Sequence, residues 1–221
     1  MIELCTGRLS EIAVIGAHCD DVAIGMGGTL LSLARATPGL RIRALVLSGA
    51  GTEREDEERE ALAAFCPNAD LNVTIESIPD GRAPAHWASV KQHINAFRRS
   101  CDPDAVFGPH RDDAHQDHRL IAEVLPTEFR DHLILGFELL KWEGDTPRPV
   151  VFHPLQTAVA REKAALLMAH YASQKGKDWF DPEAFLGLSR LRGVQCRAPH
   201  AEAFVVEKLS IHFGAPRSSA E

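Results

Sequence analysis

The chain has little of what builds a disulfide framework or a cysteine-based metal site. Its 221 residues include only five cysteines, an odd number, and no two of them form a Cys-x-x-Cys pair. A disulfide framework and a zinc knuckle are therefore not expected. We interpret the cysteines as reduced thiols that mostly serve as small core residues.

The chain also has no excess of positive charge and no long apolar run. The net charge is -7, so the positive surface that binds nucleic acid is not expected. The apolar runs fall well short of the ~18 residues that span a bilayer, and no basic-then-apolar leader is visible. We expect a cytoplasmic protein without a membrane span that acts on a small molecule. The sequence leaves a homo-oligomer open.

What the chain does contain is a regular alternation of two patterns. Strand-like apolar runs lie at 11–17, 40–47, 71–77, 105–108 and 132–136, and helical patterns lie between and after them at 23–36, 55–65, 87–99 and 118–124. Such alternation predicts an α/β fold with a Rossmann-like, mostly parallel sheet and helices on both of its faces. Functional sites of such sheets form at the carboxyl ends of the strands.

Beyond residue 137 the alternation loosens. A long loop over 141–149, helices at 155–171 and 182–191 and a last strand at 201–206 are expected. We interpret residues 1–221 as a single domain. About 10–137 would form its core of sheet and helices, and about 138–213 would supply loops, helices and a closing strand that wall a pocket. The loops 141–145 and 173–180 should line that pocket, since long loops in compact domains tend to be functional.

The first segment that carries chemistry is His18-Cys19-Asp20-Asp21, directly after the apolar run 12–17. A strand would deliver His18 and the carboxylates to the edge of the sheet. There they could bind a divalent metal and leave one carboxylate for acid–base chemistry. The alternative is structural: the aspartates cap the following helix, and His18 is a buried imidazole.

The second segment is His115-Gln116-Asp117-His118, shortly after the apolar run 105–108. His115 and His118 share a face if a helix begins there, and Asp117 can fix the tautomer of a neighbouring ring. A solvated loop with a capping aspartate is the alternative. Two such segments, both after strands, favour a metal-dependent hydrolase.

These motifs resemble those of the LmbE/PIG-L family of zinc-dependent N-deacetylases, which act on N-acetylglucosamine conjugates and related acetylated amino sugars. The family's motifs stand here as Ala17-His18-Cys19-Asp20-Asp21-Val22, Gly25-Met26-Gly27-Gly28-Thr29-Leu30 and His115-Gln116-Asp117-His118. Further similarity at 136–138, 141–145, 179–182, 192–193 and 202–204 extends the resemblance over nearly the whole chain.

The resemblance implies a site and a reaction. The zinc ligands that it implies, for one ion per chain, are His18, Asp21 and His118. It implies Asp20 as the general base, and His115, protonated and oriented by Asp117, as the group that stabilises the oxyanion. The expected reaction is hydrolysis of an N-acetyl amide to acetate and a free amine.

Two positions depart from the family pattern. Cys19 replaces a proline, and Val22 replaces an acidic residue. Cys19 fits either a core thiol or an additional soft metal ligand. The substitution at Val22 puts in question the contact that the family's carboxylate makes, and it leaves the expected metal ligands untouched.

Four residues outside the central motifs are candidates for substrate contact: Arg54, Asp113, Trp142 and Trp179. Each has a structural alternative, which is a solvated helix face for Arg54, a loop cap for Asp113 and plain packing for the two indoles. The leading hypothesis is a zinc-dependent deacetylase of an acetylated amino sugar or its conjugate. The alternatives are a related metallohydrolase acting on another amide or ester bond, and a sugar-binding module that has lost turnover.

Overall fold

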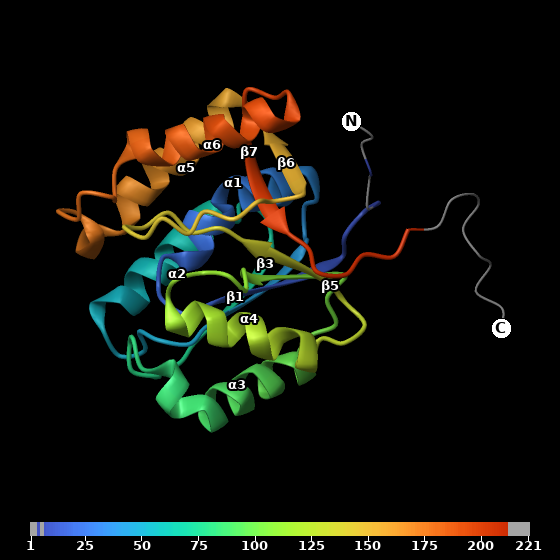
Figure 1. Cartoon of the computed structure of the whole chain (residues 1–221), viewed down its shortest axis with the longest axis vertical. Coiled ribbons are helices and arrows are strands. Elements are labelled where there is room, and N and C mark those ends of the chain that lie inside the picture. Colours follow the sequence, from blue (N-terminus) through green and yellow to red (C-terminus); the bar gives the residue numbers. More distant parts are fainter. Residues whose placement is uncertain (1–3, 5–6, 212–221) are drawn as a thin grey trace.

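In the computed structural model, the described part of the chain, residue 4 and residues 7–211, contains one mixed sheet (Figure 1). Its strands are β1 (Glu11–Gly16), β2 (Arg41–Val46), β3 (Asp70–Ile75), β4 (Ala105–Pro109), β5 (Leu133–Phe137), β6 (Val151–Leu155) and β7 (His200–Val205). Their order across the sheet is β3-β2-β1-β4-β5-β7-β6. The first five strands are parallel, and β7 runs antiparallel to both of its neighbours.

Helices cover both faces of this sheet (Figure 1). They are α1 (Asp21–Ala36), α2 (Glu53–Phe65), α3 (Trp87–Arg99), α4 (Gln116–Glu128), α5 (Thr157–His170) and α6 (Pro182–Cys196), with 3-10 turns η1 (Ala83–His86) and η2 (Ala172–Gln174). Side chains alternate along β1: Ile12 and Val14 pack with α1, α2, α5 and α6, whereas Ala13 and Ile15 pack with α3 and α4. The predicted α/β sheet with helices on both faces is confirmed.

The order of the strands places a crevice between β1 and β4. From β1 the chain builds β2 and β3 on one side, then crosses back to add β4 and β5 on the other. The loops after β1 and β4 therefore leave in opposite directions, which opens the crevice where ligands bind in such sheets. Because Val14 pairs with Phe107, the segments that follow Gly16 and Pro109 leave the sheet at the same level.

The edge strand β6 is absent from the sequence-based prediction, which placed a helix from residue 155 directly after a loop. In the structure Val151–Leu155 pairs with β7, and α5 begins only at Thr157. Pro154 argues against a central strand, and prolines in sheets are confined largely to edges. β6 and β7 extend the same sheet as β1–β5. The predicted second part of the chain ends at 213, so its last two residues lie outside the described residues.

The Gly-x-Gly-Gly-Thr motif lets α1 pack directly against its neighbours. A Cβ atom on Gly27 would lie 2.7 Å from the Phe65 ring, and one on Gly28 would lie 2.6 Å from Leu155. The helix is interrupted at Met26, whose φ is −145°. The close approach of α1 to α2 at Gly27 and to β6 at Gly28 therefore requires glycine at these positions.

A buried carboxylate satisfies the backbone just after this interruption. Glu202 of β7 accepts the N–H groups of Gly28 and Thr29 at 2.9 and 2.6 Å. Lys163 of α5 donates to Glu202 at 2.6 Å and to the carbonyl of Ile24. The network joins the late strand β7 and helix α5 to the first helix.

Two further features of the described residues concern membrane-spanning helices and cysteines. Among the described helices, none combines the length and the apolar character needed to traverse a lipid bilayer. The cysteines that the structure describes, Cys19, Cys66, Cys101 and Cys196, are free.

We predict that Glu202→Ala lowers the free energy of unfolding by about 3–5 kcal/mol, because it leaves the Lys163 ammonium buried without its carboxylate. Chemical denaturation of both proteins measures the change. Glu207→Ala is the control, since Glu207 pairs with Arg111 at the exposed surface and should change stability by at most about 1 kcal/mol. Equal effects of the two variants would contradict a stabilising role of the buried network.

Candidate metal centre

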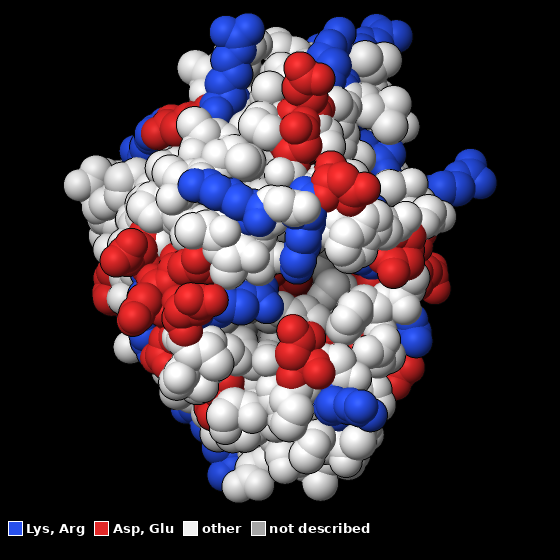
Figure 2. Space-filling view, turned by 90° about the vertical axis from the view of Figure 1, so that its left-hand side faces the viewer, with Lys and Arg blue, Asp and Glu red and all other residues white. Residues whose placement is uncertain are grey.

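A cavity of about 220 Å³ opens at the carboxyl edge of the sheet, between the ends of β1 and β4. Figure 2 looks onto this edge and shows a hollow with acidic and basic side chains around it. Residues of both motifs line the cavity, together with Arg54, Asp80, Lys141, Trp142, Lys177 and Trp179. A second cavity, of about 240 Å³ beside α4, contains none of the predicted metal ligands.

Three donor atoms converge at the floor of the first cavity. His118 Nε2 lies 3.2 Å from Asp21 Oδ2 and 3.2 Å from His18 Nδ1, and His18 Nδ1 lies 3.6 Å from Asp21 Oδ2. Tetrahedral zinc bound to nitrogen and oxygen separates its ligand atoms by about 3.3–3.6 Å. Two imidazoles and one carboxylate at these distances fit a small divalent ion.

The turn after β1 produces this arrangement. Asp21 Oδ2 accepts the backbone N–H groups of Ala17 and His18 at 2.8 and 2.9 Å, which folds the first helical turn back onto the strand. Asp20 has a left-handed backbone, with φ 115°. Such a conformation costs a non-glycine residue about 1–3 kcal/mol and persists only where the surroundings enforce it.

Each imidazole of the donor cluster faces a carboxylate on its other side. His18 Nε2 lies 3.2 Å from Asp117 Oδ2 and 3.1 Å from Asp80 Oδ1. His118 Nδ1 lies 3.1 Å from Asp113 Oδ2. Carboxylates in this position fix the tautomer of a metal-binding imidazole and turn its free nitrogen toward the ion. The donor chemistry therefore fits a metal centre.

The structure changes the expected role of Asp117. Its carboxylate accepts from His18 and from the N–H groups of Gly81 and Ala83, so it orients His18 and not the ring of His115. Its hydrogen bond to that ring comes from the backbone N–H, which donates to His115 Nδ1 at 3.3 Å. The geometry assigns the ring proton of neutral His115 to Nε2.

Electrostatics also argue against the expected charge on His115. Burial and the neighbouring rings of His118 and His18 lower the pKa of His115. The carboxylate that was expected to keep it protonated faces His18 instead. We therefore describe His115 as a neutral donor through Nε2–H.

Asp113, expected to contact the substrate, lies elsewhere. It is 1% exposed and does not line the cavity, so it cannot meet a substrate directly. Lys141 Nζ lies 3.1 Å from its other oxygen, Oδ1. Although burial acts in the opposite direction, contact with His118 lowers the pKa of Asp113 to about 2. The aspartate therefore stays ionised behind His118.

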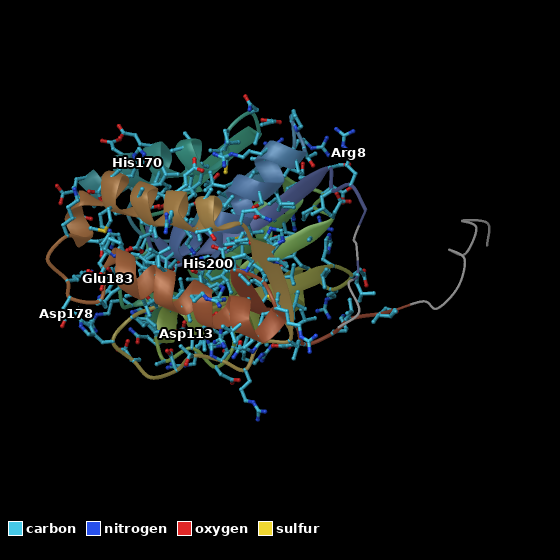
Figure 3. All side chains as sticks on the ribbon, turned by 90° about the horizontal axis from the view of Figure 1, so that it is seen from above. Arg8, Asp113, His170, Asp178, Glu183 and His200 are labelled. Carbon is cyan, nitrogen blue, oxygen red and sulfur yellow. The ribbon has the colours of Figure 1, made fainter. Side chains whose placement is uncertain are left out.

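The other three substrate candidates line the cavity. The rings of Trp142 and Trp179 meet edge to face, with centroids 6.0 Å apart. Trp142 Nε1 donates at 2.6 Å to Asp178, which lies on the loop before α6 (Figure 3). Arg54 lies 3.2 Å from Asp20 Oδ2 and also donates to the carbonyl of Cys19.

Asp20 is buried beside these groups. Burial raises the pKa of its carboxyl group to about 7, although the Arg54 guanidinium favours the ionised form. A carboxylate with this pKa can take up and release a proton near neutral pH.

Sequence reasoning did not identify Asp80 as part of the site. Asp80 lines the cavity and contacts both His18 and Arg54. Its sequence context, Pro79-Asp80-Gly81, is typical of a turn and carries no sign of a site. Cys19 is fully buried against Val46 and Ile75, which matches its interpretation as a core thiol.

We predict that Asp113→Asn weakens zinc binding by about 10- to 100-fold, the usual effect of losing a carboxylate behind a metal-binding imidazole. Competition against a chelator of known affinity measures this change. Asp112→Asn is the matched control because Asp112 is the exposed neighbour and should leave zinc affinity unchanged. Equal zinc affinities of the two variants would refute the role given to Asp113.

Comparisons with known structures show that the fold is shared. N,N'-diacetylchitobiose deacetylase from Pyrococcus horikoshii matches with a TM-score of 0.70 and 18% identity, covering 90% of this chain and 84% of that one. The conserved protein TT1542 from Thermus thermophilus matches with a TM-score of 0.70 and 23% identity, covering 96% of this chain and 100% of that one. GalB, the 4-carboxy-2-hydroxymuconate hydratase from Pseudomonas putida, matches with a TM-score of 0.69 and 16% identity, covering 94% of this chain and 100% of that one.

The comparison with family models bears on function as well as fold. The model for PIG-L, described as GlcNAc-PI de-N-acetylase, matches residues 13–127, which span both motifs and more than half of the chain. This match supports a deacetylase function. Together with the paired motifs and the shared fold, it shows that the chain belongs to the PIG-L family.

Proposed function

We propose that this protein is a zinc-dependent deacetylase that removes the N-acetyl group from an acetylated amino sugar or its conjugate. The observation that carries the proposal is the convergence of His18 Nδ1, Asp21 Oδ2 and His118 Nε2 within 3.6 Å of one another. Asp20 and His115 line the same cavity. The family match supports the same reaction class.

Zinc held by these three side chains would lower the pKa of water and polarise the amide carbonyl, while keeping a coordination position free for the reaction. Asp20, which lines the cavity, would accept the proton of the attacking water and return it to the leaving amine. The Nε2–H of His115 donates to the oxyanion that develops on the carbonyl oxygen. These two residues divide proton transfer and charge stabilisation between them.

The cavity wall supports a sugar as substrate. The indoles of Trp142 and Trp179 offer apolar surface on which the carbon face of a pyranose can pack. Asp80, Arg54 and Lys177 line the same cavity and offer acceptors and donors for hydroxyl groups. The P. horikoshii enzyme, named for N,N'-diacetylchitobiose, supports an acetylated amino sugar as the first substrate class to test.

The proposal is tested by measuring zinc content and acetate release from a panel of N-acetylated sugars and their conjugates. We expect about one zinc ion per chain, acetate release from at least one conjugate, and loss of activity after chelation that added zinc restores. A protein that binds no metal and releases no acetate with zinc supplied would exclude the proposal. Metal-dependent hydrolysis confined to other amides or esters would favour the related metallohydrolase instead.

We predict that Asp20→Asn reduces kcat by at least about 10²-fold, within the range for losing a general acid–base group, while the zinc content stays unchanged. The amide cannot accept the proton, whereas the donors of His18, Asp21 and His118 are retained. Steady-state acetate release and metal analysis of the same preparation measure both quantities. Near-normal turnover of the zinc-loaded variant would assign the base to another residue.

The pH profile provides a separate prediction about Asp20. Asp20 must be ionised to act as the base, so kcat/KM should fall as the pH drops through the pKa of Asp20. Bound zinc would favour the ionised form, which places this acidic limb of the profile at or below about pH 7. Arg54 also favours the ionised form, so Arg54→Gln should move the limb to higher pH. Arg59→Gln, on the exposed face of α2, should leave it in place. An unmoved limb in Arg54→Gln would contradict this assignment.

A further inference from the structure

Glu58 is a carboxylate in an unusual position. It belongs to α2, has no exposed surface, and shares its buried side with Ala61, Leu62 and Phe65. Burial raises its pKa to about 8. Placing an ionisable group in such surroundings costs stability unless its contacts offset the loss of water. An apolar residue would fill this place in the core more readily, so the contacts of Glu58 need an explanation.

These contacts lead to the backbone of Asp20. Glu58 Oε2 accepts the N–H of Asp20 at 2.9 Å and the hydroxyl of Tyr171 at 2.7 Å. Tyr171 is itself fully buried and directly follows α5. Glu58 therefore connects α2, the start of α1 and the end of α5 at one point.

The Asp20 backbone requires such support. Its φ of 115° lies in a region that side chains rarely adopt, and relaxation to an ordinary conformation would turn the carboxylate of Asp20 to a different direction. The hydrogen bond from its N–H to a buried acceptor opposes this relaxation. Proton transfer depends on the placement of the base, because a misplacement of about 1 Å can cost 10²-fold in rate.

We propose that Glu58 is a positioning residue that holds the backbone of Asp20 so that its carboxylate faces the reaction, with Tyr171 fixing Glu58 in turn. This inference rests on the proposed function only in taking Asp20 as the general base. Glu58 touches neither the cavity nor any of the three donor atoms of the metal centre in the contacts of the described residues. It acts through Asp20.

The neighbouring Glu57 offers a matched comparison on the same helix. Its carboxylate accepts the N–H and the hydroxyl of Ser173 at 2.8 and 2.6 Å. Ser173 is followed by Gln174, which lines the cavity. Glu57 therefore holds the wall of the cavity, whereas Glu58 holds the base, and loss of each glutamate should affect a different kinetic constant.

The experiment compares Glu58→Leu, Glu58→Gln, Tyr171→Phe and Glu57→Leu in the zinc-loaded enzyme. For Glu58→Leu we expect kcat to fall by about 10²-fold, with KM and zinc content nearly unchanged. Glu58→Gln should retain most of kcat, since its amide oxygen accepts the same N–H, and Tyr171→Phe should lie between these two. Glu57→Leu should mainly raise KM.

Hydrogen exchange of the Asp20 amide is a readout that does not need turnover. It should be protected in the wild type and in Glu58→Gln, and should exchange faster in Glu58→Leu. If the wild-type protein releases no acetate, the proposed function fails, and amide exchange still decides whether Glu58 holds Asp20.

Three results would overturn the inference. They are an unchanged kcat in zinc-loaded Glu58→Leu, a loss of kcat that only follows a loss of zinc, and equal exchange of the Asp20 amide in all variants. If Glu58→Leu does not fold, Tyr171→Phe decides by itself, because it keeps Glu58 and removes one hydroxyl. Unchanged kcat and unchanged amide exchange in that variant would then refute the proposal.

Discussion

The pairing of β1 with β4 is the contact on which the candidate site depends. These strands are separated by two strand–helix units in the chain, yet they are neighbours in the sheet and in register. Their pairing brings the segment after Gly16 and the segment after Pro109 to the same edge. Because the chain leaves β1 toward one side of the sheet and β4 toward the other, helices do not fill the space between them. His18, Asp21 and His118 meet in that space.

Once the segments meet, the concentration of buried charge dictates how the side chains are arranged. The carboxylates of Asp21, Asp113 and Asp117 lie beside two imidazoles, and although burial acts in the opposite direction, these contacts lower the pKa of each carboxyl group and keep it ionised. The arrangement leaves one nitrogen of each ring facing the donor cluster and the other facing a carboxylate. It is a preorganised set of donors, which is what a divalent ion requires.

The shared fold does not by itself determine the reaction. One structure with this fold is named a deacetylase and another a hydratase, so chemistry must be argued from side chains. In this chain the strained Asp20, the neutral His115 and the wall formed by Trp142 and Trp179 are the features that bear on the reaction. Long loops after residue 137 carry both indoles, and contacts such as Lys141 with Asp113 attach one of these loops to the candidate metal centre.

The sequence by itself determined the α/β class, most of the helices and strands, and the family, because hydrophobic periodicity and closely spaced motifs are local properties. It also indicated the candidate ligands His18, Asp21 and His118, which stand within two short segments. Only the tertiary structure decided which carboxylate faces which ring, the burial of Asp113, the contacts of Asp80 and Glu58, and the pairing of β6 with β7. Most of these depend on contacts between residues far apart in the chain, and all of them depend on side-chain direction and burial after the elements have packed.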